Sequence, residues 1–183
     1  MAYITSIFIY LALAPAIFAC MQCPEIKRTK SINFAEIAGD WFMVASTPDL
    51  NVKCRNIVIS KAIKNTYKMK LQHYENFFFT LWHNVQTITV EDNQNYSKFE
   101  VPNPFSLFKT EYTFLDGDLS DYMLLHTCYR HIIFVNEYYE LWTRNLTGNC
   151  QNVIDSVTET LDLYKIKPED MTCSVPDGCY FGS

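Results

Sequence analysis

The feature that most constrains the fold is an alternation of apolar and polar residues, clearest over residues 67–74. Successive side chains of a β-strand point to opposite faces, so a period of two predicts a strand with one buried face. Tyr67, Met69, Leu71 and His73 share that face. Similar strands are expected at about residues 40–47, 55–63, 77–90, 96–101, 110–116, 121–129 and 131–144, with turn signals between them. Eight sequential strands predict an all-β fold, an eight-stranded antiparallel up-and-down β-barrel that holds one small ligand.

The pattern changes after the strands. From Asn149 to Tyr164 the apolar residues recur at helical spacing, and Thr147 or Asn149 is available as the N-cap. We expect one amphipathic helix on the outside of the barrel. Pro168 ends the helical pattern, and residues 171–174 predict a short edge strand.

Composition limits the classes of function. The 183 residues contain no stretch rich in Pro, Gly or Ser that would serve as a linker, so residues 20–183 are expected to form a single domain. The net charge is -5 and no basic run occurs, which argues against nucleic acid and anionic membrane surfaces as partners. Cys20 and Cys23 form the only close cysteine pair, so no metal site is expected.

The first nineteen residues predict a secretory signal peptide. They are uncharged, with an apolar run at residues 7–14 followed by Ala14, Ala16 and Ala19. A membrane anchor is the alternative, but the run is shorter than the ~20 residues that a spanning helix needs, and Pro15 interrupts it. We therefore expect a secreted, extracellular protein without stable membrane insertion. Glycosylation is expected at Asn95 and Asn145, which begin the two Asn-x-Ser/Thr sequences.

Three motifs together resemble the lipocalin family, most closely the arthropod bilin-binding and apolipoprotein D (Lazarillo-like) type. The first is Asn33-Phe34 followed by residues 39–42, Gly-Asp-Trp-Phe. The second is Asp118 followed by Tyr122 and Cys128, and the third is Arg144 at the end of the last expected strand. The similarity covers about residues 23–179.

The resemblance implies structural roles for these residues. Trp41 after Gly39 would close the floor of the barrel, Arg144 would lie across its indole ring, and Asp118 would fix the neighbouring loop. The chain departs from the family beside Asp118, because Gly117 and Leu119 stand where Thr and Tyr are usual.

Seven cysteines in an exported chain imply disulfides. The resemblance implies the pairs Cys23–Cys128 and Cys54–Cys179, which leave Cys150 and Cys173 to pair across the helix. Cys173 has Cys54 as its alternative partner. Cys20 is then left over or removed with the signal peptide.

The function expected from this fold is that of a carrier for a small hydrophobic ligand such as a bilin, retinoid, sterol or fatty acid. Cavities for such ligands are lined by apolar and aromatic side chains. The expected cavity residues are Met43, Tyr67, Met69, Leu71, His73, Phe79, Leu81, Phe114, Leu124, Val135 and Tyr139. No catalytic constellation occurs, no cofactor is required, and the pattern does not predict the oligomeric state.

Three other functions stay open. Residues 71–75 resemble the segment that supplies the haem-ligating histidine in the nitrophorin branch of the family, so His73 is a candidate haem ligand. An unpaired cysteine would suit an enzyme with a thiol nucleophile, although Cys20 explains the odd count more simply. A protein-binding lipocalin would use loops such as residues 104–108, which are apolar.

Overall fold

The computed structural model describes residues 22–27, 30–48, 50, 53–62, 66–77, 80–91, 97–102, 109–130, 134–145 and 149–174. The expected signal peptide, the loop at 104–108 and the residues Cys20, Phe79, Asn95 and Cys179 lie outside these ranges. For His73, Leu81 and Cys54 the structure describes the backbone only.

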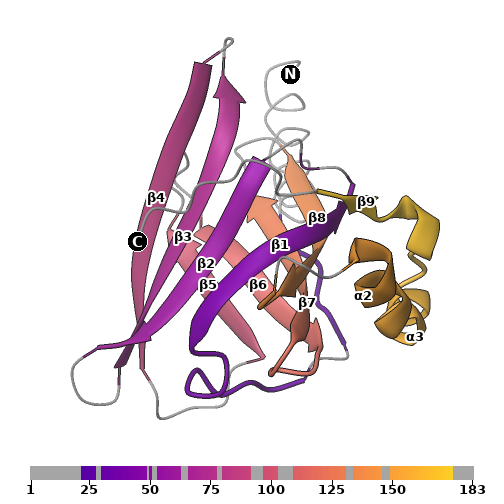
Figure 1. Ribbon diagram of the computed structural model, residues 1–183, viewed down its shortest axis with the longest axis horizontal. Helices are drawn as coiled ribbons and strands as arrows, with labels where there is room; N and C mark the ends of the chain where they lie inside the picture. The colour runs from indigo at the N-terminus through magenta and orange to yellow at the C-terminus, as the bar shows by residue number, and fades with distance from the viewer. Residues whose placement is uncertain are drawn as a thin grey trace, which may run out of the picture.

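A single antiparallel sheet dominates the structure and curls into a half-barrel (Figure 1). Its order is β4-β3-β2-β1-β8-β7-β6-β5, and β9 pairs with β1. The strands are β1 (Gly39–Thr47), β2 (Lys53–Lys61), β3 (Thr66–Phe77), β4 (Thr80–Glu91), β5 (Lys98–Pro102), β6 (Lys109–Asp116), β7 (Tyr122–Arg130), β8 (Val135–Thr143) and β9 (Thr172–Cys173). The eight expected strands and the short edge strand are confirmed, each within a few residues of its predicted bounds.

The two faces of the sheet have separate cores. The inner core contains Trp41, Met69 and Trp142, whereas the outer core lies under the helices and contains Ala45, Leu141 and others. The pairing of β1 with β8 shifts register between Met43 and Ala45. A bulge of this kind turns the strand, so the apolar residues of β1 contribute to both cores.

The expected single helix is in fact two helical segments, α2 (Cys150–Ser156) and α3 (Thr158–Leu163), followed by the 3₁₀ helix η1 (Pro168–Asp170). Asn149 is the N-cap, since its side chain accepts a hydrogen bond from the Gln151 N–H at 3.0 Å. The break falls at Val157, where the Ser156 hydroxyl donates to the Val153 carbonyl and the Thr158 hydroxyl to the Ile154 carbonyl. Such side-chain bonds compete with the helical backbone, and a β-branched residue adds to the cost. Among the described residues, no helix has the length and apolar character to span a membrane.

A turn before β1 closes one end of the half-barrel. The N–H groups of Glu36 and Ile37 donate to the Asn33 carbonyl, and the Trp41 indole N–H donates to the Ile37 carbonyl at 2.8 Å. The guanidinium of Arg144 lies over the Trp41 ring, which confirms the expected stacking.

The loop beside this end is fixed by Asp118, as expected. Its carboxylate accepts hydrogen bonds from the N–H and the hydroxyl of Ser120, and its carbonyl accepts from the N–H of Tyr122. Leu119 contributes to this end with both its backbone and its side chain: its carbonyl accepts from the Arg144 guanidinium, and its side chain packs against the inner core.

Two of the expected disulfides are present. Cys23–Cys128 ties the N-terminal segment to β7, with 6.0 Å between the Cα atoms, and Cys150–Cys173 joins α2 to β9, with 6.1 Å. The second pair excludes the alternative of Cys54 with Cys173. The expected Cys54–Cys179 pair lies outside the described residues and stays a prediction.

Candidate functional site

Five of the expected cavity residues lie on the inner face of the half-barrel. Met43, Tyr67, Met69, Leu71 and Phe114 are buried in the inner core. This position agrees with the alternation in the sequence. Whether they contact a ligand stays a prediction.

Three other residues were expected on the inner face and lie on the outer one. Leu124 is buried in the outer core and Tyr139 packs against that core, beside the helices. Val135 and Tyr139 both lie on β8, separated by an even number of residues, and the pairing of β8 with β7 has no register shift. Val135 therefore lies on the outer face with Tyr139. These strands are apolar on both faces because helices cover the outer one, so apolar character alone does not identify the inner face.

The remaining expected cavity residues are not tested. In the backbone pairing of β3 with β4, His73 lies opposite Asn84 and Leu81 lies opposite Asn76. The structure does not describe the side chains of His73 and Leu81. Phe79 lies outside the described residues altogether.

A buried ion pair crosses the inner face, which sequence reasoning missed. The Arg55 guanidinium on β2 donates to a carboxylate oxygen of Glu140 on β8, at 2.6 Å. The side chains are only 2% and 0% exposed. The sequence contained a signal for this ion pair. Arg55 lies two residues before Ile57 and so shares the face of a buried apolar residue. Glu140 lies two residues before Trp142 and does the same.

Two tyrosines complete the contacts of the Arg55 guanidinium. The same terminal nitrogen, Nη2, donates to the hydroxyl of Tyr112 at 2.8 Å and to that of Tyr129 at 2.7 Å. Burial raises the pKa of both tyrosines despite the opposing effect of Arg55. Burial by itself disfavours the charged guanidinium, but Glu140 and the tyrosines outweigh it and raise the pKa of Arg55. The cluster therefore contains a charged guanidinium and two neutral phenols.

The second carboxylate oxygen of Glu140 is also engaged. It accepts a hydrogen bond from the indole N–H of Trp142 at 3.2 Å. The Arg55 guanidinium carbon lies 5.5 Å from the centre of the Trp142 ring, within cation–π range. We call Arg55, Glu140, Tyr112, Tyr129 and Trp142 the inner polar cluster.

Two buried polar atoms on the same face have no hydrogen-bond partner among the described residues. They are Nε of Arg55 and Oγ1 of Thr127. Thr127 lies on β7 between Leu125 and Tyr129, which both belong to the inner face, and its side chain is buried. Buried polar groups are nearly always paired in proteins, with protein groups or with ordered water, so these two groups mark a place on the inner face where a further partner is needed.

Aromatic rings surround the cluster. Phe99 and Tyr112 are stacked with 5.1 Å between their ring centres, and Tyr129 meets Tyr138 edge-on at 5.5 Å. Tyr129 and Tyr138 are only partly buried. The inner polar cluster is thus a polar group within an aromatic and apolar wall, which suits recognition of a small molecule.

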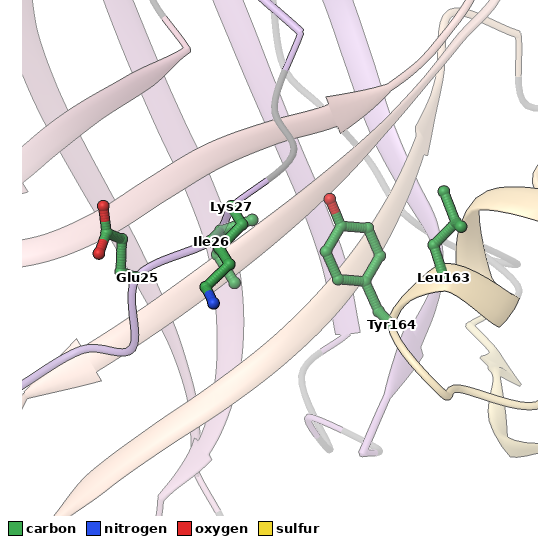
Figure 2. A pocket seen from close by; sticks show the side chains of 5 residues that line it. All are labelled: Glu25, Ile26, Lys27, Leu163 and Tyr164. Atoms are coloured by element: carbon green, nitrogen blue, oxygen red, sulfur yellow. The ribbon is translucent and has the colours of Figure 1, made fainter.

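A second candidate is a groove of about 430 Å³ on the outside of the molecule. Figure 2 shows that Glu25, Ile26 and Lys27 of the N-terminal segment line one side and that Leu163 and Tyr164 line the other. Both charged residues are exposed, and exposed charges contribute little binding energy. The inner face, with its buried donors, is the stronger candidate.

No protein-family model matches the sequence, and no curated protein matches it. Solved structures do match the fold. The tryptamine complex of the amine-binding protein of Rhodnius prolixus is 16% identical, with a TM-score of 0.66, and the match covers 87% of this chain and 90% of that one. Insecticyanin from the tobacco hornworm Manduca sexta is 17% identical, with a TM-score of 0.62 and coverage of 88% and 90%. The cockroach allergen Per a 4 is 13% identical, with a TM-score of 0.64 and coverage of 84% and 94%.

Proposed function

We propose, from the lipocalin fold that this chain has, that it is a carrier that encloses one small, largely apolar molecule against the inner face of the half-barrel. The observation that carries the proposal is the inner polar cluster within an apolar and aromatic wall. Among similar structures, the Rhodnius protein is described as an amine-binding protein, in complex with tryptamine. A ligand-binding role for this chain agrees with that description.

Burial supplies the affinity in this proposal. A ligand that buries ~300 Å² of apolar surface gains roughly 7 kcal/mol at about 25 cal/mol per Å², before the entropy of association is subtracted. Micromolar binding is therefore expected. No covalent step is needed.

Secretion is part of the proposal. The Cys23–Cys128 and Cys150–Cys173 disulfides support it, because such bonds persist mainly in oxidising compartments. Glycosylation at Asn145, which is exposed, fits the same route.

The test combines extraction with tryptophan fluorescence. Protein from its native source is extracted with organic solvent and the extract is analysed by mass spectrometry; the protein is then titrated with apolar ligands. Because Trp142 lies in the inner polar cluster, ligand binding should quench its emission, and Trp142→Phe should remove much of that signal. A protein that releases no small molecule and whose emission no apolar ligand changes contradicts the carrier.

Two alternatives predict other results. A haem ligated by His73 would give a Soret band that His73→Ala abolishes, whereas a bilin would give a broad red band. A protein-binding function through loops such as 104–108 would leave every small ligand without effect.

A further inference from the structure

We infer that the molecule bound at the inner polar cluster presents an oxygen acceptor, a carboxylate or a carbonyl, rather than a cationic amine. The inference rests on the proposed carrier function and names the chemical class of its ligand. It is carried by hydrogen bonds that are already made and by those that are missing.

Two groups that can donate a hydrogen bond lack a partner on the inner face. Arg55 Nε–H and the Thr127 hydroxyl are buried and lack partners among the described residues. Thr127 lies on β7, opposite Tyr112 of β6 on one side and Tyr138 of β8 on the other. Its neighbour Tyr112 belongs to the inner polar cluster. An oxygen acceptor placed here satisfies donors that are otherwise costly to bury.

The acceptors of the cluster are already engaged. Glu140 accepts from Arg55 with one oxygen and from Trp142 with the other, at 2.6 and 3.2 Å. The hydroxyl oxygens of Tyr112 and Tyr129 both accept from Arg55. Beyond a bond to the Thr127 hydroxyl, an ammonium group would have to share these oxygens with Arg55, a cation that cannot lose its charge.

Charge alone does not select the ligand. Arg55 and Glu140 neutralise each other, so the cluster has no surplus charge of either sign to offset the desolvation of an ion, and the unpaired hydrogen-bonding groups decide. The hydroxyls of Tyr112 and Tyr129 are hydrogen-bonded to each other, so one phenol proton of the two is left to donate to a ligand. An oxygen acceptor therefore meets two unpaired donors, Arg55 Nε–H and the Thr127 O–H. An ammonium meets only one unengaged acceptor, the Thr127 oxygen, and Arg55 Nε–H stays unpaired.

Aromatic side chains are available to contact the apolar part of the ligand. The Phe99–Tyr112 stack and the rings of Trp142 and Phe114 belong to the same inner core. A flat aromatic or conjugated body suits such surroundings, because ring contacts add to the energy of burial.

The experiment compares three probes that share one ring system: indole-3-acetate, its neutral methyl ester, and tryptamine. Each is titrated into the full-length protein by calorimetry at pH 7. We expect both oxygen-bearing probes to bind at least tenfold more tightly than tryptamine. Tryptamine binding as tightly as the acid and the ester overturns the inference.

A matched pair of variants locates the acceptor. Thr127→Val removes the unpaired hydroxyl at nearly constant volume, and Thr113→Val makes the same change at a buried position on the outer face. We expect Thr127→Val to weaken the acid and the ester at least fivefold, to leave tryptamine unchanged, and to keep or raise the melting temperature. Thr113→Val should leave all three affinities unchanged.

The remaining outcomes are distinct. If Thr127→Val keeps wild-type affinity for the acid and the ester, the donors bind water only and the inference is wrong. If an unrelated apolar probe binds but the indoles show no preference, the carrier proposal stands and the inference fails. If no apolar probe binds, the carrier proposal itself fails.

Discussion

The guanidinium carbon of Arg144 lies 4.2 Å from the centre of the Trp41 ring, and the same guanidinium donates to three backbone carbonyls. Its nitrogens reach the oxygens of Ala38 at 2.8 Å, Glu36 at 3.0 Å and Leu119 at 3.1 Å. One side chain thus covers the indole and joins the turn before β1 to the loop before β7. Backbone carbonyls fix the Arg144 guanidinium at this end of the half-barrel, while the Asp118 carboxylate holds the loop itself.

Loss of the Trp41 ring should cost more than loss of Arg144. Trp41 is fully buried, so Trp41→Ala should lower the free energy of unfolding by about 3 to 5 kcal/mol through the cavity it leaves. Arg144→Ala should cost less, because it removes packing and hydrogen bonds at a partly exposed position. Urea unfolding of the two variants decides the order. A change of only a few tenths of a kcal/mol for Trp41→Ala would contradict its place in the core.

Gly39 is the residue that lets Arg144 lie where it does. Its φ is +117°, which L side chains rarely adopt, and a Cβ there would be 2.7 Å from a terminal nitrogen of Arg144. Gly39→Ala should therefore destabilise the protein by about 1 to 3 kcal/mol, through backbone strain and the displaced guanidinium.

A double-mutant cycle separates those two causes. In an Arg144→Ala background only the backbone strain remains, so Gly39→Ala should cost less there than in the wild type. Thermal melts of the four proteins give the coupling. Equal costs in both backgrounds would show that the clash with Arg144 contributes nothing.

Most of the fold could be predicted from the sequence because it depends on local pattern. Period-two alternation predicted the strands, and the helix was expected to begin at Thr147 or Asn149, of which Asn149 is the N-cap. The break at Val157 could not be predicted, since it depends on which carbonyls the hydroxyls of Ser156 and Thr158 reach.

The candidate site was harder to predict because it depends on which strands face each other. Leu124 and Tyr139 are apolar, as cavity residues are, yet they lie under the helices. Arg55 and Glu140 are 85 positions apart, and their pairing follows only from the curl of the sheet. The signal that could have indicated the inner polar cluster was a charged residue, Arg55 or Glu140, at a position that alternates with the apolar residues of the inner face.

Asp116 should make stability depend on pH. Its carboxylate contacts Lys30 and Thr160 and accepts from the Gly117 N–H, so it links β6 to α3 and the N-terminal segment. Burial alone would raise the pKa of Asp116, but these hydrogen bonds outweigh it and lower the pKa. A lowered pKa in the folded state gives stability that is present above the ordinary value of about 3.9 and is lost as the pH falls through the folded value.

The variant Asp116→Asn tests this dependence. It should be less stable than the wild type by about 1 kcal/mol at pH 7, through its lost charge-assisted bonds. The gap should narrow as the pH falls below about 3.9, because the carboxyl group of the unfolded chain then takes up its proton while the pKa of the folded group is lower. Urea unfolding at pH 7 and pH 3 measures both differences. A gap that stays the same at both values would mean that the charge of Asp116 contributes nothing.

The Arg55–Glu140 pair should tolerate joint replacement better than the loss of one partner. Glu140→Gln leaves the Arg55 guanidinium buried without its counter-ion, and breaking a buried pair in this way costs about 3 to 5 kcal/mol. Replacing both by apolar residues, Arg55→Met with Glu140→Leu, removes the buried charge altogether and should restore much of that loss. Urea unfolding of Glu140→Gln and the double variant gives the two values.

Since Tyr112, Tyr129 and Trp142 lose partners in the double variant, its stability should remain somewhat below that of the wild type. A double variant less stable than Glu140→Gln would show that the tyrosine and tryptophan contacts, rather than the ion pair, dominate the cluster.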